Sequence, residues 1–139
     1  MENIKREVDL TITGKQRNAD DSDSSVVKVK GTLSTVNGKT VVFYEEISED
    51  GDKFKCLLKF DENSLEHSKT GEVKSKFIFK KGWKYLGTYQ TPFGDFEMGT
   101  DTKFYEMSEC EGKINLHAIY DMEINNEFAS ENEILIEIS

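Results

Sequence analysis

The stretch TYQTPFGDFEMGTDT, residues 88–102, decides the fold. It contains the single proline of the chain, Pro92, and Gly94 follows two residues later. Proline presets the backbone angle φ for the second position of a type I turn, and glycine is favoured at the fourth position. The stretch therefore predicts a four-residue turn over residues 91–94, in which Gly94 needs a positive φ.

The residues on both sides of this turn alternate as they do in strands. One face carries Trp83, Tyr85, Gly87 and Tyr89 before the turn, and Phe96, Met98, Thr100, Thr102 and Phe104 after it. A four-residue turn places Tyr89 opposite Phe96. It also places Tyr85 opposite Thr100, so the two apolar faces match. A glycine bulge at Gly94, the alternative, mismatches the faces, and a long antiparallel hairpin is therefore favoured.

The rest of the chain repeats this design. Alternating segments are found at residues 4–13, 27–33, 40–47, 54–60, 65–67, 73–79, 114–122 and 134–138. Turn signals separate them, the strongest being Asn37-Gly38, and no window shows apolar residues at helical spacing with a capping signal. Regular strands joined by short turns indicate a meander, and closure removes its exposed edges. The prediction is an all-β, closed or nearly closed antiparallel up-and-down barrel of about 8–10 strands, with the first strand beside the last.

The length of 139 residues fits one domain, so residues 1–139 are assigned to a single barrel. Residues 18–25, NADDSDSS, have too little apolar surface to offset the entropy of ordering. They are expected to form a mobile acidic loop.

The formal net charge of −9 disfavours nucleic acid and anionic membranes as partners, because the general field repels them. The first residues, MENIKREVD, have no apolar segment typical of a signal peptide, and the cytoplasm is the expected location. Cys56 and Cys110 lie far apart without a CxxC spacing, which favours two buried, reduced thiols over a disulfide. The oligomeric state is left open.

Catalytic and metal signatures are weak. His67 and His117 show no metal-binding spacing and are expected at the surface or rim, so no metal and no cofactor is predicted. His117 lies on the face opposite Leu116 and Ala118. The serines cluster in loops, and Cys56 lies on an apolar face where burial makes a thiol inert. No catalytic residue is assigned; a non-enzymatic role is favoured over an enzyme.

Several short motifs recur in the order of a known family. They are Tyr44-Glu45-Glu46, Lys69-Thr70-Gly71, Tyr89 with residues 91–94, Thr100-Asp101-Thr102 and Ile119-Tyr120-Asp121-Met122. From about residue 8 to its end, the chain resembles the YwiB-like proteins, bacterial calycin-type (lipocalin-like) β-barrels of unassigned function. The resemblance implies the barrel fold and a tendency to hold apolar ligands inside it. The family tends to carry arginine at the position of Lys69, which lacks the planar fork of a guanidinium.

The leading hypothesis is a protein that binds a small, partly apolar ligand in the barrel interior. The residues assigned to this site are Tyr44, Glu46, Lys69, Tyr85, Tyr89, Thr100 and Tyr120. Alternation leaves Glu45 or Glu46 inward, with Glu46 favoured. An inward acid is expected to recruit Lys69 and a phenol such as Tyr89 or Tyr120. The alternatives are a rim position for these ions and a filled core that presents its outer face to a protein partner.

Overall fold

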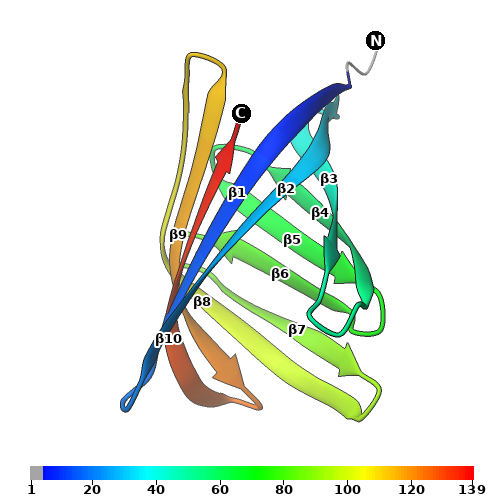
Figure 1. Cartoon of the computed structure of the whole chain (residues 1–139). Coiled ribbons are helices and arrows are strands. Elements are labelled where there is room, and N and C mark those ends of the chain that lie inside the picture. Colours follow the sequence, from blue (N-terminus) through cyan, green and yellow to red (C-terminus); the bar gives the residue numbers. More distant parts are fainter. Residues whose placement is uncertain (1–4) are drawn as a thin grey trace.

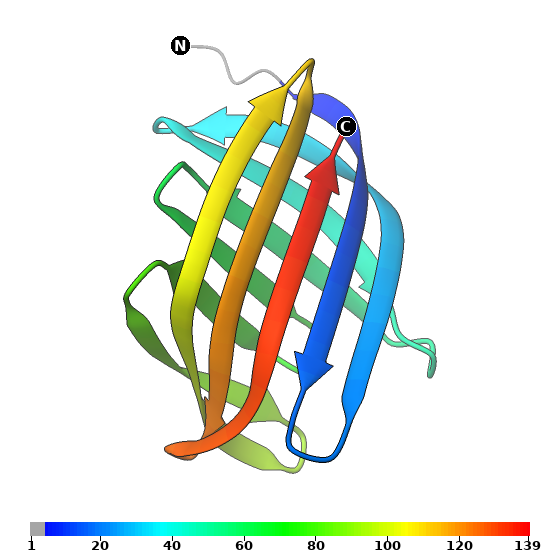
Figure 2. The same ribbon diagram turned by 90° about the vertical axis from the view of Figure 1, so that its left-hand side faces the viewer.

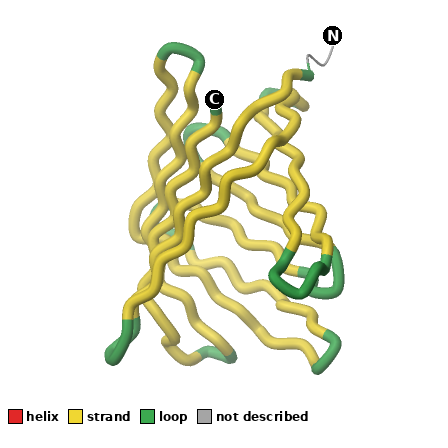
Figure 3. Tube along the Cα trace, viewed as in Figure 1, coloured by secondary structure: helices red, strands yellow, loops and turns green. Residues whose placement is uncertain are grey.

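The computed structural model describes residues 5–139, and every element in it is a strand (Figures 1 and 3). The strands are β1 Arg6–Arg17, β2 Ser22–Val36, β3 Lys39–Ile47, β4 Lys53–Phe60, β5 Ser64–Thr70, β6 Ser75–Lys80, β7 Lys84–Thr91, β8 Gly94–Cys110, β9 Lys113–Ile124 and β10 Glu127–Ile138. The described residues include no helix that could cross a membrane. Ile4, which the alternation assigned to the first strand, lies outside the described residues.

All ten strands form one antiparallel sheet in the order β6-β5-β4-β3-β2-β1-β10-β9-β8-β7. The first and last strands pair as predicted, with Leu10 opposite Ile138 and Ile12 opposite Ile136. Figure 2 shows β1 and β10 side by side in the curved wall. The barrel closes incompletely between β6 and β7, where one bridge joins Lys74 to Gln90 through two backbone hydrogen bonds of 2.9 Å.

The central hairpin has the predicted register. Tyr89 lies opposite Phe96 and Tyr85 opposite Thr100, and the turn closes at Thr91 and Gly94. Gly94 has a φ of 135°, which side chains rarely tolerate. The four-residue turn is therefore confirmed.

A bulge in β8 corrects the predicted inner face of that strand. The register shifts between Thr102 and Phe104, so Tyr105 is buried and Phe104 packs edge-on against His117 on the outer face. Strict alternation placed Phe104 inside, because one inserted residue cannot be seen in the pattern. Trp83 also leaves the predicted face, since it lies in the β6–β7 turn and is 44% exposed.

The first turn is shorter than the expected loop. β2 begins at Ser22 and pairs with Arg17, so residues 22–25 are strand and only 18–21 form the turn. Backbone pairing with β1 compensates for the polar side chains in this part of β2, where Asp23 lies opposite Gln16. The hairpin projects beyond the barrel at the lower left of Figure 1.

The interior has two contrasting ends. The closed end lies near the turns after β2, β4, β6 and β8, and its inward side chains are apolar and almost fully buried. They include Leu10, Val42, Leu58, Phe60, Leu65, Phe79, Ile114, Leu116, Ile136 and Ile138. The open end lies near the turns after β1, β3, β5, β7 and β9. Its inward side chains include several polar residues, among them Tyr44, His67, Thr102 and Asn132, which form the candidate site.

Candidate functional site

One wall of the open end consists of β3, β4 and β5 and carries a connected polar cluster. Tyr44 is 2% exposed, and its hydroxyl lies 2.9 Å from Nε2 of His67. Glu46 follows on the same face of β3, and its Oε2 lies 3.2 Å from Nζ of Lys69. The thiol of Cys56 donates a weak hydrogen bond of 3.8 Å to the same carboxylate. The strand register therefore brings together three of the residues assigned to the site from sequence.

Burial controls the protonation of this cluster. It raises the pKa of the Tyr44 phenol, with Cys56 and Glu46 adding to the shift, so the hydroxyl stays protonated. It lowers the pKa of His67 to about 4; Lys69 adds to this effect and Glu46 opposes it. Nε2 of a neutral His67 can accept a hydrogen bond from the Tyr44 hydroxyl. The wall is therefore uncharged except for the Glu46–Lys69 pair.

The Glu46–Lys69 pair confirms that Glu46 faces inward with lysine as its partner. Both side chains are 28% exposed, which places the pair at the mouth of the barrel. Lys69 also lies 5.2 Å from the centre of the Phe54 ring. Neither Tyr89 nor Tyr120 hydrogen-bonds this pair, so the expected phenol partner is wrong. The buried phenol of this wall, Tyr44, bonds to histidine instead.

The opposite wall consists of β8, β9 and β10 and carries uncharged polar side chains. Thr100, Thr102 and Ser130 are fully buried, and Asn132 is 9% exposed. The Thr100 hydroxyl donates a 3.2 Å hydrogen bond to the carbonyl of Ile78, across the seam between β8 and β6. The hydroxyl oxygen of Thr102 has no hydrogen-bond partner. Leaving a buried polar atom without a partner costs free energy, so the Thr102 hydroxyl is a candidate hydrogen-bonding group for a bound molecule.

Tyr120 belongs to this second wall. Its ring lies 4.6 Å from that of Phe79, measured between centroids, and burial raises the pKa of its phenol to about 12. The strand ladders place it opposite Thr102 on β8 and opposite Asn132 on β10. Residues directly opposite each other have Cβ atoms about 5 Å apart, so the three side chains form one row.

A cavity of about 240 Å³ at the open end is lined by two members of this row, Tyr120 and Asn132, and Thr102 lies buried behind them as the cross-strand neighbour of Tyr120. Its inward-facing lining includes Gly14, Gln16, Tyr120, Met122, Asn132 and Ile134. These residues combine the aliphatic side chains of Met122 and Ile134 with two amides and a phenol, and Lys15, Asp23, Ser24, Ser25 and Glu133 complete the lining. An apolar surface with a few polar groups is typical of sites for small, partly apolar molecules.

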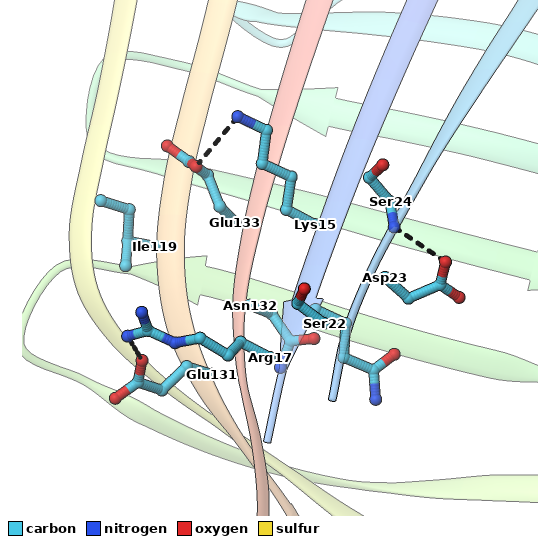
Figure 4. Close-up of a pocket in the computed structure, with 10 residues that line it drawn as sticks. Lys15, Arg17, Ser22, Asp23, Ser24, Ile119, Glu131, Asn132 and Glu133 are labelled. Atoms are coloured by element: carbon cyan, nitrogen blue, oxygen red, sulfur yellow. Dashed lines mark hydrogen bonds and ion pairs between the residues drawn. The ribbon is translucent and has the colours of Figure 1, made fainter. Parts of the chain in front are cut away.

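A larger hollow of about 600 Å³ overlaps this region (Figure 4). Four of its five charged side chains pair with one another across the β1–β10 ladder, Lys15 with Glu133 and Arg17 with Glu131; the fifth is Asp23. The Arg17 and Glu131 side chains are more than half exposed. Because four of its ions are already paired, this hollow offers few unsatisfied charged groups to a ligand.

Tyr85 and Tyr89 line β7 beside the incomplete seam and are only partly buried. The Tyr85 ring lies over Gly87, so close that a Cβ at that glycine would stand 2.7 Å from Cε2 of the tyrosine. Gly87 therefore leaves room for a phenol at the seam. Of the seven residues assigned from sequence, Thr100 and Tyr120 lie on the second wall. Tyr85 and Tyr89 lie between the two walls. Their role with a ligand stays a prediction.

His67 shows where sequence reasoning failed. It was expected at the surface or rim, but it shares the inner face with Leu65 and Lys69 and bonds to Tyr44. The alternation of the short fifth strand contained that signal. Thr102 and Asn132 were also missed as site residues, because a buried threonine or asparagine gives no pattern that separates it from a surface one. His117 does lie outside, with Nε2 2.5 Å from Glu133.

The potential metal ligands and the two thiols are scattered over the barrel. No group of three or more histidine, cysteine or acidic side chains within residues 5–139 is arranged to hold an ion. Both thiols are free, and burial raises the pKa of Cys56. Cys110 is exposed rather than buried, because it ends β8 at a turn that extends past the barrel.

Fold and site together define a nearly closed ten-stranded antiparallel β-barrel with one packed end and one polar end. The chain belongs to the family of the domain of unknown function DUF1934, whose model matches residues 10–136. It is 28% identical over 127 residues to the uncharacterized β-barrel protein YwiB of Bacillus subtilis (strain 168), covering 89% of this chain and 88% of that protein. The structure is also similar to the crystal structure of ywiB protein from Bacillus subtilis, with a TM-score of 0.86 and 21% sequence identity. The match covers 97% of this chain and 92% of the other.

Proposed function

We propose that this protein binds a small, partly apolar molecule at the open end of the barrel interior, without catalysing a reaction on it. The observation that carries the proposal is the buried, unpartnered hydroxyl of Thr102 in the same row as Tyr120 and Asn132. Such a row beside a cavity of about 240 Å³ supplies both hydrogen-bonding groups and an apolar surface. A purely structural barrel gains nothing from leaving this hydroxyl unsatisfied.

The packed closed end supports the same proposal. Phe60, Leu65 and Leu58 are fully buried there, so a ligand can enter only part of the interior. Tyr120, which lines the cavity, packs against the buried Phe79 with ring centroids 4.6 Å apart. The ligand is therefore expected at the open end, near Met122 and Ile134. A location in the cytoplasm, with neither nucleic acid nor membrane as partner, stays a prediction.

A fluorescence titration with N-phenyl-1-naphthylamine, a neutral apolar probe, tests the proposal. We expect saturable binding with a stoichiometry of about one, as for a single interior site. Met122→Trp fills the cavity and is expected to abolish binding. Ile119→Trp adds the same ring to the outer face of the same strand, where Ile119 is 38% exposed, and is expected to retain it.

Circular dichroism and thermal unfolding establish that both variants fold. The filled-core alternative gains support if the wild-type protein does not bind the probe. If Ile119→Trp loses the probe while Met122→Trp keeps it, the outer hollow of Figure 4 is the binding site instead.

A further inference from the structure

The row formed by Thr102, Tyr120 and Asn132 carries information about the kind of ligand, because its hydrogen-bonding capacity is only partly used. The Asn132 amide nitrogen donates to Oγ of Ser130 at 3.0 Å and to the Ser130 carbonyl at 3.3 Å. Its Oδ1 can accept a hydrogen bond, and none of the side-chain hydrogen bonds found among the described residues uses it. The Thr102 hydroxyl has no partner at all.

Tyr120 completes the row as a donor. Its ring is fixed against Phe79, and none of the described residues hydrogen-bonds its hydroxyl. A protonated phenol beside a threonine hydroxyl offers two donors, and the free Asn132 oxygen offers an acceptor. An uncharged group such as a carboxamide matches this set, with a carbonyl for the donors and an N–H for the acceptor.

Charged groups near the row do not favour an anion. Glu46 and Lys69 neutralise each other on the opposite wall at 3.2 Å. Lys15 at the rim of the cavity pairs with Glu133 at 4.0 Å. Asp23 also lines the cavity and repels a second carboxylate. A ligand carboxylate would lose its hydration there without gaining a cationic partner.

We infer that the open end selects ligands with an uncharged hydrogen-bonding head, of the carboxamide, ester or alcohol class, on an apolar body, and discriminates against free carboxylates. This inference rests on the proposed binding function and narrows it to one chemical class. The head contacts the row formed by Thr102, Tyr120 and Asn132, and the apolar body lies along Met122 and Ile134.

Competition against N-phenyl-1-naphthylamine tests the inference with ligands that share one chain and differ in the head. Decanamide and decanol are expected to displace the probe at concentrations at least about tenfold below those needed for decanoate, because an unpaired buried carboxylate is costly. Decylamine tests attraction to Asp23 and is expected to compete no better than decanol.

Two buried threonines in β8 provide matched variants. Thr102→Val is expected to weaken decanamide binding about five- to tenfold, the effect of one neutral hydrogen bond, and to leave decanoate unchanged. Thr102→Ser retains a hydroxyl and is expected to keep the wild-type preference for decanamide over decanoate. Thr100→Val removes a hydroxyl that already bonds to Ile78, so it is expected to lower stability and keep the preference for decanamide.

The outcomes separate this inference from the proposed function. If the probe binds and decanoate or decylamine competes as well as decanamide, the inference is overturned and the binding function stands. The same holds if the probe binds and none of the four compounds displaces it. If the probe does not bind, the proposed function itself fails.

Discussion

The closed and open ends of the barrel are built from the same ten strands but solve opposite problems. At the closed end the inward side chains exclude water, and Phe60, Leu65 and Ile138 are fully buried. At the open end several inward side chains are polar and hydrogen-bond one another, as Tyr44 and His67 do. The difference indicates that the packing that stabilises the barrel is concentrated at the closed end.

This division follows the direction of the chain. In the odd-numbered strands the polar inward residues come last, as with His67 and Lys69 after Leu65 in β5. In β10, an even-numbered strand, the polar residue comes first, with Asn132 before Ile136. Because neighbouring strands are antiparallel, this reversal brings the polar segments of such strands to the same end.

The largest expected effect comes from the same substitution at each end. Phe60→Ala, at a fully buried position of the closed end, is expected to lower the free energy of unfolding by about 3–5 kcal/mol. Phe96→Ala removes the same ring from the inner face of the open end, where it is 41% exposed, and is expected to cost less than about 1.5 kcal/mol. Urea denaturation measures both. Equal losses would mean that the ends do not differ in packing.

His67 provides a pH-dependent test of the open end. Its pKa of about 4 in the folded protein lies below the ordinary value of 6.5. Between these two pH values the folded protein keeps His67 neutral, whereas the unfolded chain protonates it. The stabilisation is complete above pH 6.5 and is lost as the pH falls through 4, with a magnitude on the order of 2–3 kcal/mol.

The measurement is the free energy of unfolding between pH 7 and pH 4.5. We expect the stability of the wild-type protein to fall faster over this range than that of His67→Gln. Parallel curves for the two proteins would show that His67 is not buried in the neutral form.

The smallest effect concerns the ion pair at the mouth. Lys69→Met and Glu46→Gln are each expected to cost about 1 kcal/mol, and a double-mutant cycle is expected to give a coupling of about 0.5–1 kcal/mol. The 28% exposure of both side chains limits the effect to less than a fully buried pair provides. Lys53 and Glu45, whose side chains are 63% and 45% exposed, form a control pair whose expected coupling is below about 0.5 kcal/mol. Equal couplings in the two pairs would show that the Glu46–Lys69 pair is as strongly screened by solvent as an ordinary surface pair.

Alternation was sufficient to predict the strands, the register of Tyr89 with Phe96 and the pairing of β1 with β10. It left Glu45 or Glu46 inward, and the family resemblance pointed to Lys69 as the partner of the inward acid; the structure pairs Lys69 with Glu46. Alternation failed at Phe104, because one bulge residue reverses the faces without a sequence signal. It placed Thr102 on the same face as Thr100, but it did not assign Thr102 or Asn132 to the site. The row that they form with Tyr120 depends on the registers of β8 with β9 and of β10 with β9, and each of these ladders contains a bulge.

Methyl NMR during titration with N-phenyl-1-naphthylamine tests most directly whether the probe enters the open end of the barrel and not the closed end. With labelled methionine, isoleucine and leucine methyl groups, we predict shifts at Met122 and Ile134 and unchanged signals at Leu58 and Leu65. Shifts centred on Leu58 and Leu65, or on Ile119 of the outer face, would contradict the assignment of the open end as the binding site.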